Sequence, residues 1–158
     1  MSKGIIAVDV DLTVCAIDEL WLEWLCNVTN SSYITSMDVI SYQMVNNTPV
    51  PYNLSEMFRE DLDKHDIDGL DFFRGSSIYD FAYPVSGAIE ALKSLKESGY
   101  EVVFVSTCKG FHSKSKYYWL KRHFPFMSGF IATKEKYYTR CDIIIDDRIS
   151  HLNSMPDD

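Results

Sequence analysis

The expected fold of this chain of 158 residues is decided by a short stretch near its start, IIAVDVDLT at positions 5–13. Its first four residues form an apolar run, which is typical of a strand buried on both faces of a parallel sheet. The run stops abruptly at Asp9, and a second acid, Asp11, follows two residues later. In an open parallel sheet the carboxyl ends of the strands lie on one edge, where ligands bind. The two acids are therefore expected at a ligand-binding edge.

Apolar runs and helical periodicity alternate along the rest of the chain. Further buried strands are predicted at residues 102–105, 129–133 and 143–145. Apolar residues at helical spacing predict helices over residues 18–28 and 113–123, and a third that begins after Pro84 and is closed by Gly99. Strands that alternate with helices imply a parallel sheet and an α/β fold.

The segment between the first strand and Pro84 has a different texture. Residues 30–83 are polar and rich in Asn, Ser and Asp, with short apolar clusters between them. This pattern indicates several short helices joined by loops. We therefore expect a core made of residues 1–16 and 84–158, and a small helical cap, residues 17–83, inserted after the first strand.

Composition and charge narrow the class of protein. Apolar residues make up 46% and charged residues 24%, which is ordinary for a globular chain. The net charge of −8 argues against a nucleic-acid partner or an anionic membrane surface, since both favour a basic protein. No apolar run approaches the ~20 residues of a membrane-spanning helix. The four cysteines form no CxxC pair and the N-terminal apolar run is too short for a secretory signal, so a reducing, cytoplasmic location is expected.

Polar residues follow three of the predicted strands and should meet at the same sheet edge. They are Asp9, Asp11 and Thr13 after the first strand, Ser106 and Thr107 after the second, and Asp146 and Asp147 after the last, with Lys136 ahead of that last strand. The four carboxylates and one ammonium sum to −3, and such a cluster cannot stay ionised in a partly desolvated pocket without a cation. Oxygen ligands favour Mg²⁺ over zinc, so Mg²⁺ is the expected cofactor.

The same residues resemble the motifs of a known superfamily. The sequence DVDLT at positions 9–13 looks like the first motif of the haloacid dehalogenase (HAD) superfamily of phosphotransferases, and Ser106 looks like its second. Lys136 resembles the third motif, and Asp146 with Asp147 resembles the fourth. Four motifs in order on the right elements form a specific match. The resemblance implies a three-layer, Rossmann-like parallel sheet of the HAD type with an inserted cap.

Within that superfamily the chain resembles the small 5′(3′)-deoxyribonucleotidases. The segment TKEK at positions 133–136, with an acid pair ten residues beyond its lysine, is similar to theirs. So is the pair Phe72 and Phe73 followed by PVSGA at positions 84–88. The resemblance implies a phosphomonoesterase that hydrolyses (deoxy)ribonucleoside 5′-monophosphates through an aspartyl-phosphate.

The resemblance also implies a role for each member of the cluster. Asp9 would attack phosphorus, and Asp11 would protonate the leaving alcohol and then activate water. Ser106, Thr107 and Lys136 would bind the phosphoryl oxygens. The metal would be held by Asp9, the backbone carbonyl of Asp11, and the pair Asp146 and Asp147, and the sequence leaves open which of this pair is the direct ligand.

The chain departs from these relatives in two places. Many of them have Gly-Val where this chain has Leu12 and Thr13. They also usually continue well past the fourth motif, whereas only ten residues follow Arg148 here. Either the sheet is smaller or a partner chain supplies its edge, so a homodimer is one expectation and a monomer the other.

The distribution of aromatic residues is relevant to whether the substrate carries a nucleobase. Half of the 22 aromatic residues of the chain lie between residues 17 and 83. A cap that stacks a nucleobase needs such side chains near the mouth of the site, but the core of a small helical unit needs them as well. Phe72 and Phe73 are the candidates for base stacking.

A basic stretch with aromatic residues between its charges begins just past Ser106. It comprises Lys109, His112, Lys114, Lys116, Lys121 and Arg122. Two interpretations fit it, namely steering of an anionic substrate and the solvated face of a surface helix. His65 and His151 receive no role, because neither has a ligand-like partner nearby in the sequence.

Other functions stay open beside the nucleotide phosphatase. One is a HAD phosphatase that acts on sugar phosphates or on the phosphate ends of nucleic acids. Another is a receiver-type phosphoaccepting module, although receivers lack a long insertion after the first strand. A third is a catalytically silent binding protein. The expected partner is a small nucleotide substrate, with no membrane and no stable nucleic-acid partner.

Overall fold

The computed structural model describes residues 2–32, 53–75 and 77–153 and divides the chain into two compact units. One unit comprises Met1–Ala16 and Ala82–Asp158, and is called the sheet unit below. The other comprises Ile17–Phe81, and is called the helical unit. Each unit is described by itself.

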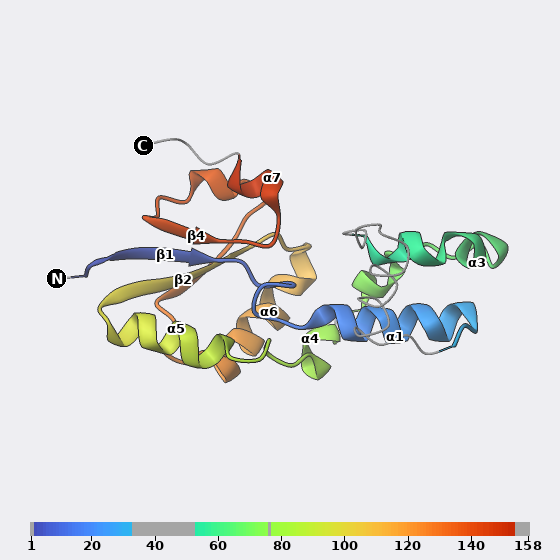
Figure 1. Cartoon of the computed structure of the whole chain (residues 1–158), viewed down its shortest axis with the longest axis horizontal. Coiled ribbons are helices and arrows are strands. Elements are labelled where there is room, and N and C mark those ends of the chain that lie inside the picture. Colours follow the sequence, from blue (N-terminus) through green and yellow to red (C-terminus); the bar gives the residue numbers. More distant parts are fainter. Residues whose placement is uncertain (1, 33–52, 76, 154–158) are drawn as a thin grey trace, which may run out of the picture. The chain divides into compact units, whose positions relative to one another are not determined.

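In the described residues, the sheet unit is built on four parallel strands. They are β1 (Gly4–Val8), β2 (Tyr100–Ser106), β3 (Gly129–Ala132) and β4 (Ile143–Ile145), in the order β3-β2-β1-β4 (Figure 1). Each coincides with an apolar run of the sequence, and β1 and β2 bury the side chains toward their carboxyl ends, as strands covered on both faces do. The prediction of buried strands is wrong for β3 and β4, where Ile131, Ile143 and Ile145 are exposed. The predicted α/β class with a parallel sheet is confirmed.

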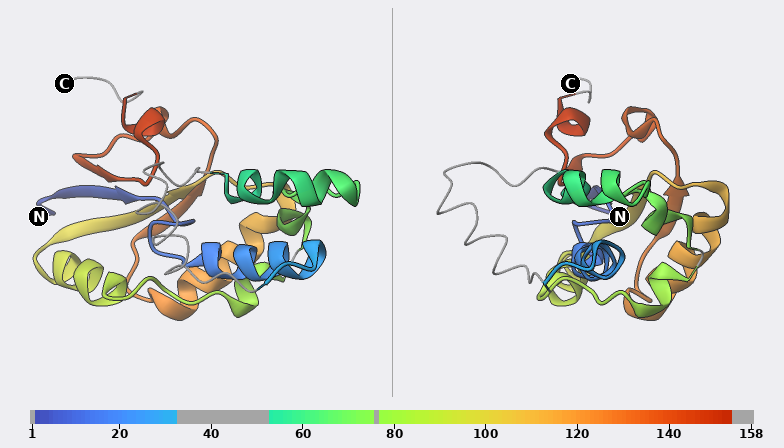
Figure 2. Two further views of the ribbon diagram at one scale, coloured as in Figure 1. Left: turned by 45° about the vertical axis from the view of Figure 1, so that its right-hand side comes forward. Right: turned by 90° about the vertical axis from the view of Figure 1, so that its right-hand side faces the viewer.

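The helices of this unit follow the strands. They are α5 (Ala88–Glu97), α6 (Gly110–His123) and α7 (Ile149–Leu152), with a short 3₁₀ turn η3 (Lys136–Tyr138) before β4. Figures 1 and 2 place α7 next to β4, away from α5 and α6. The core beneath α6 includes Phe104 of β2 against Phe124, with ring centroids 5.0 Å apart. Helix α5 ends where Gly99 takes a left-handed φ of 100°, as the sequence predicts for a helix-stopping glycine.

Hydrogen bonding between the strands continues past their ends. The Asp9 N–H donates to the carbonyl of Ile145 at 2.9 Å, and the Thr133 N–H donates to the carbonyl of Ser106 at 3.0 Å. The first bond joins the residue after β1 to the end of β4, and the second joins the residue after β3 to the end of β2. The polar residues that follow the strands are therefore held by the backbone of the sheet.

A tight turn follows β1. The Leu12 N–H donates to the carbonyl of Cys15, and the Cys15 N–H donates to the carbonyl of Val10. Leu12 itself has a φ of 63°, in the left-handed region that favours glycine. A side chain in this conformation costs about 1–2 kcal/mol.

Two short chain segments lead out of the sheet unit and back into it. They pair through the Ala16 N–H on the carbonyl of Tyr83 and the Val85 N–H on the carbonyl of Val14, both at 2.9 Å. The indole N–H of Trp119 on α6 donates to the carbonyl of Ala82 at 2.9 Å. Helix α6 thus anchors the returning segment.

The helical unit consists of short helices around an aromatic core. They are α1 (Ile17–Thr29), η1 (Leu54–Phe58), α3 (Arg59–Lys64), η2 (Asp71–Arg74) and α4 (Ile78–Phe81). Trp21 of α1 is buried and its indole N–H donates to the carbonyl of Gly69 at 2.9 Å. Part of the aromatic-rich segment, including Tyr33, Tyr42 and Tyr52, falls outside the described residues.

Candidate active site

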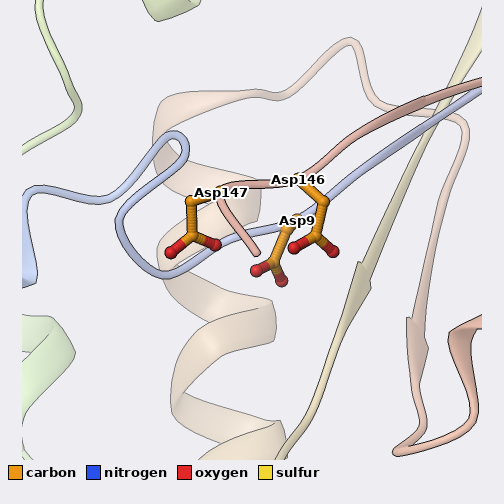
Figure 3. A group of neighbouring side chains, drawn as sticks. All are labelled: Asp9, Asp146 and Asp147. Atoms are coloured by element: carbon orange, nitrogen blue, oxygen red, sulfur yellow. The ribbon is translucent and has the colours of Figure 1, made fainter. Parts of the chain in front are cut away.

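Residues far apart in the sequence meet at the carboxyl edge of the sheet. Asp9 follows β1, whereas Asp146 and Asp147 follow β4 (Figure 3). One carboxylate oxygen from each of the three lies within 4.8 Å of the others. Ser106 ends β2, which pairs with β1, and it is buried. The edge predicted from the strand ends is therefore present.

Lys136 joins two of these acids. Its ammonium lies 2.8 Å from Asp9 Oδ1 and 2.6 Å from Asp146 Oδ2. The Lys136 side chain is only 3% exposed, so the ion pairs are screened little by water. Turn η3 positions this lysine ahead of β4, in the short connection from β3.

Asp146 is the most enclosed of the acids, with a side chain that is 0% exposed. Besides Lys136, it accepts the Arg148 N–H at 2.9 Å, and His151 Nδ1 lies 3.1 Å from each of its oxygens. Burial alone would raise the pKa of Asp146, but the hydrogen bonds from Lys136 and from the Arg148 N–H outweigh burial and hold that pKa below its usual value. Asp146 is therefore ionised at neutral pH.

A second buried lysine belongs to the site. The ammonium of Lys116 lies 2.7 Å from Asp11 Oδ2, 2.8 Å from Ser106 Oγ and 3.0 Å from the carbonyl oxygen of Thr107. Its side chain is 1% exposed. Lys116 thus ties the second acid of the first motif to the end of β2.

Both interpretations of the basic stretch on α6 are wrong for Lys116, which neither faces solvent nor lies free on the surface to attract a substrate. His112, one turn earlier, is buried as well. The signal was present in the sequence, because Lys116 lies on the same stripe of α6 as Trp119 and Leu120, which are both buried. Lys114 is exposed, and its ammonium lies 6.0 Å from the ring centroid of Tyr118.

His151 was also missed from the sequence. Its contact with Asp146 arises because α7 turns the chain back immediately after the acid pair. His151 lies five positions after Asp146, and a four-residue helix leaves no apolar periodicity from which that contact could be predicted.

The remaining candidates lie in different surroundings. Thr107 is exposed, and its hydroxyl donates to the carbonyl of Thr133 at 3.4 Å. Phe72 and Phe73 belong to the helical unit, where Phe72 is buried and its ring centroid lies 6.5 Å from that of Trp21 and 5.0 Å from that of Phe73. Phe72 therefore packs in the core of that unit, which is evidence against the prediction that it stacks a nucleobase.

The electrostatics of the cluster suit a divalent cation. Four carboxylates and two buried ammonium groups give a formal charge of −2, rather than the −3 expected without Lys116. Burial raises the pKa of Asp9 to about 6 in spite of Lys136, and burial together with Asp146 raises the pKa of Asp147. One Mg²⁺ would neutralise the formal charge, and the donor set of carboxylate oxygens fits that ion.

We expect the metal-free protein to lose stability as the pH rises from about 4 to about 6. Folding raises the pKa of Asp9 from 3.8 to about 6, so the folded state holds this proton more tightly than the unfolded chain does. The resulting stabilisation is complete below the unfolded pKa and is lost as the pH rises through the folded pKa. It amounts to at most about 3 kcal/mol. Thermal unfolding in a chelator across this pH range measures it.

Asp9→Asn is the matched control, because an amide cannot ionise. The variant should gain stability relative to the natural chain as the pH rises, and the gain should reach its limit above the folded pKa of Asp9. A difference between the two proteins that does not change with pH would contradict the assignment of a raised pKa to Asp9.

Comparison with known proteins identifies the family. Residues 3–157 match the family model of the 5′ nucleotidase, deoxy (pyrimidine), cytosolic type C protein. The chain belongs to this family. Its members are nucleotidases, so the predicted resemblance to deoxyribonucleotidases and the predicted class of enzyme, a phosphoric monoester hydrolase acting on nucleotides, are confirmed.

Two solved hydrolase structures are similar to this chain. The HAD-hydrolase YfnB from Bacillus subtilis, bound to magnesium, has 15% sequence identity and a TM-score of 0.48 over 86% of this chain and 67% of its own. A haloacid dehalogenase-like hydrolase from Xanthomonas campestris has 16% identity and a TM-score of 0.43 over 85% of this chain and 64% of its own. The chain thus spans about two thirds of the length of each. No curated sequence matches the chain significantly.

Proposed function

We propose that this chain hydrolyses nucleoside 5′-monophosphates, with deoxyribonucleotides among its substrates, by a Mg²⁺-dependent mechanism through an aspartyl-phosphate on Asp9. The observation that carries the proposal is the meeting of Asp9 with Asp146 and Asp147 at one sheet edge, with Lys136 between two of them. Membership of the nucleotidase family supports the nucleotide as substrate.

Asp9 is the nucleophile in this mechanism. A carboxylate oxygen of Asp9 attacks phosphorus, the bond between phosphorus and the ester oxygen breaks, and its electron pair leaves with that oxygen. Asp11 gives the departing oxygen a proton. Water then attacks the phosphorus of the aspartyl-phosphate, Asp11 takes a proton from it, and Asp9 is released together with inorganic phosphate.

Each of the two catalytic acids pairs with a different buried lysine. Lys136 holds Asp9, and its positive charge offsets the negative charge that develops on the phosphoryl oxygens. Lys116 holds Asp11, whose side chain is 28% exposed and can therefore reach a substrate. Ser106 and Thr107 lie beside Lys116 at the end of β2 and would donate to the phosphoryl group.

The residues present would hold Mg²⁺ through Asp9, the backbone carbonyl of Asp11 and Asp147. Both oxygens of Asp146 already accept hydrogen bonds, from Lys136 and from the Arg148 N–H, which favours Asp147 as the direct ligand and leaves Asp146 as a supporting group. When bound, the cation would neutralise the charge of the carboxylates and of the phosphoryl group. The charge of the cluster and the spacing of its oxygens support this assignment.

The helical unit, inserted after β1, is the proposed cap domain of the enzyme. A cytosolic location agrees with the four free cysteines and with the cytosolic type in the name of the family. None of the helices in the described residues is both long and apolar enough to cross a bilayer.

In the described sheet β4 pairs on one side only, so a second copy pairing there would give the homodimer considered from the sequence.

A panel of phosphate esters tests the proposal. Purified protein with Mg²⁺ should release phosphate repeatedly from deoxynucleoside 5′-monophosphates, and faster than from sugar phosphates or from phosphorylated ends of oligonucleotides. A chelator should abolish release and added Mg²⁺ should restore it. A receiver-type module would instead incorporate phosphate once and stop. Faster release from sugar phosphates, or release that survives the chelator, would contradict the proposal.

A further inference from the structure

We propose that His151 is a positioning residue for the reaction, which holds the carboxylate of Asp146 in the orientation that fixes the Lys136 ammonium beside Asp9. The inference rests on the proposed function, because it assigns His151 a part in supporting the nucleophile. His151 lies outside the four motifs found in the sequence.

The contacts form a continuous chain from His151 to the nucleophile. His151 Nδ1 lies 3.1 Å from both oxygens of Asp146. Asp146 Oδ2 accepts the ammonium of Lys136 at 2.6 Å, and the same ammonium lies 2.8 Å from Asp9 Oδ1. Each step is a hydrogen bond to an ionised group, which is the stronger kind.

The position of His151 suits a group that orients a carboxylate. Its side chain is 21% exposed, whereas the side chain of Asp146 is fully enclosed, so His151 closes the solvent side of that acid. The Arg148 N–H fixes one oxygen of Asp146, and His151 lies across both oxygens. Without it, the carboxylate would keep its bonds to Lys136 and to the Arg148 N–H but lose the side-chain donor that lies across both of its oxygens, and so would turn more freely.

A purely structural role predicts something different. None of the four residues of α7, Ile149–Leu152, is buried, so the contact between His151 and Asp146 could serve only to anchor this helix. In that case any change that loosens α7 would have the same effect as removing the imidazole. A positioning role instead requires that the hydrogen bond itself, and not the helix, matters for turnover.

The kinetic test compares three variants with Mg²⁺ and a deoxynucleoside monophosphate. His151→Leu removes the donor and keeps the bulk, and should lower kcat about tenfold with little change in KM. His151→Asn, whose amide N–H can replace Nδ1–H, should restore most of kcat. Leu152→Ala, which alters α7 next to His151 without removing the donor, should leave kcat unchanged.

A spectroscopic readout makes the test independent of activity. In the metal-free protein, long-range ¹H–¹⁵N NMR should find the neutral His151 ring with its proton on Nδ1, as donation to Asp146 requires. The ¹H–¹⁵N signal of the Lys136 ammonium should shift in His151→Leu and return towards its original position in His151→Asn.

The outcomes separate this inference from the proposed function. If the natural chain releases no phosphate from any ester, the proposed function fails, while the NMR arm still tests the contact of His151 with Asp146 and Lys136. The inference is overturned if His151→Leu keeps its kcat, or if His151→Asn fails to rescue it. It is also overturned if Leu152→Ala loses as much kcat as His151→Leu, or if the Lys136 signal does not move.

Discussion

Asp9→Asn should reduce phosphate release from a deoxynucleoside monophosphate by about 10⁴-fold or more, because an amide cannot attack phosphorus. The substitution keeps the shape of the side chain and an oxygen that can still accept the Lys136 ammonium, now 2.8 Å from Asp9 Oδ1. The loss should therefore appear in kcat. Steady-state phosphate release measures it, and acid-quenched samples of the natural chain should contain a phosphorylated protein that the variant lacks.

Asp80→Asn makes the same chemical change on the exposed surface of the helical unit and should leave kcat unchanged. Thermal unfolding of Asp9→Asn should remain cooperative, which separates loss of the nucleophile from loss of the fold. Retention of activity by Asp9→Asn, or loss of activity in Asp80→Asn, would contradict the assignment of the nucleophile.

Lys116→Met should lower kcat for the same nucleotide by about 10²–10³-fold, which is within the usual contribution of a general acid–base group. The change removes the ammonium that lies 2.7 Å from Asp11 Oδ2 and 2.8 Å from Ser106 Oγ, but it keeps the apolar stem on the buried stripe of α6. Asp11 would then be free to leave the position from which it protonates the ester oxygen.

The dependence on the leaving group makes this prediction specific. An ester with an acidic leaving group, such as p-nitrophenyl phosphate, needs little help from Asp11, so Lys116→Met should affect it much less than it affects a nucleotide. Lys114→Met, two residues earlier and exposed, is the matched control and should behave like the natural chain. Equal losses for both esters would show that Lys116 does not act through Asp11.

The part of the site that was predicted from the sequence is the part carried by strands. The run before Asp9 and the run before Asp146 are short, wholly apolar and end in acids, and parallel pairing puts such ends at one edge. The prediction needed no knowledge of individual contacts, because parallel pairing by itself brings the carboxyl ends of distant strands to one edge of the sheet. Lys136 was placed in the cluster by its position ahead of the last strand, and the resemblance supplied its role.

Lys116 and His151 were missed because their roles depend on which way a helix faces. On α6 a buried lysine and the exposed Lys114 look alike when only charge is counted. Its position on the same stripe as Trp119 and Leu120 distinguishes Lys116 from Lys114. That position alone does not predict burial, because a charged residue is usually exposed. The neighbouring Asp11, supplied by a different element, pairs with its ammonium together with Ser106 Oγ and the Thr107 carbonyl, and these contacts make that burial favourable.

Base stacking could not be assigned from the sequence for a related reason. Phe72 and Phe73 fit a nucleobase site by composition, but the same side chains can pack against Trp21 within the helical unit. Aromatic residues in a small unit are used first for its own core, because few other side chains offer as much apolar area. Composition alone does not distinguish the two uses.

The left-handed backbone at Leu12 has a consequence for the order in which the protein assembles. A short peptide with this sequence would rarely adopt that conformation, since it costs about 1–2 kcal/mol. The bonds that hold it come from Val10 and Cys15, whose own places depend on β1 and on the pairing with Pro84. The loop that carries the nucleophile and its partner acid should therefore acquire its native shape late in folding, after the sheet beneath it has formed.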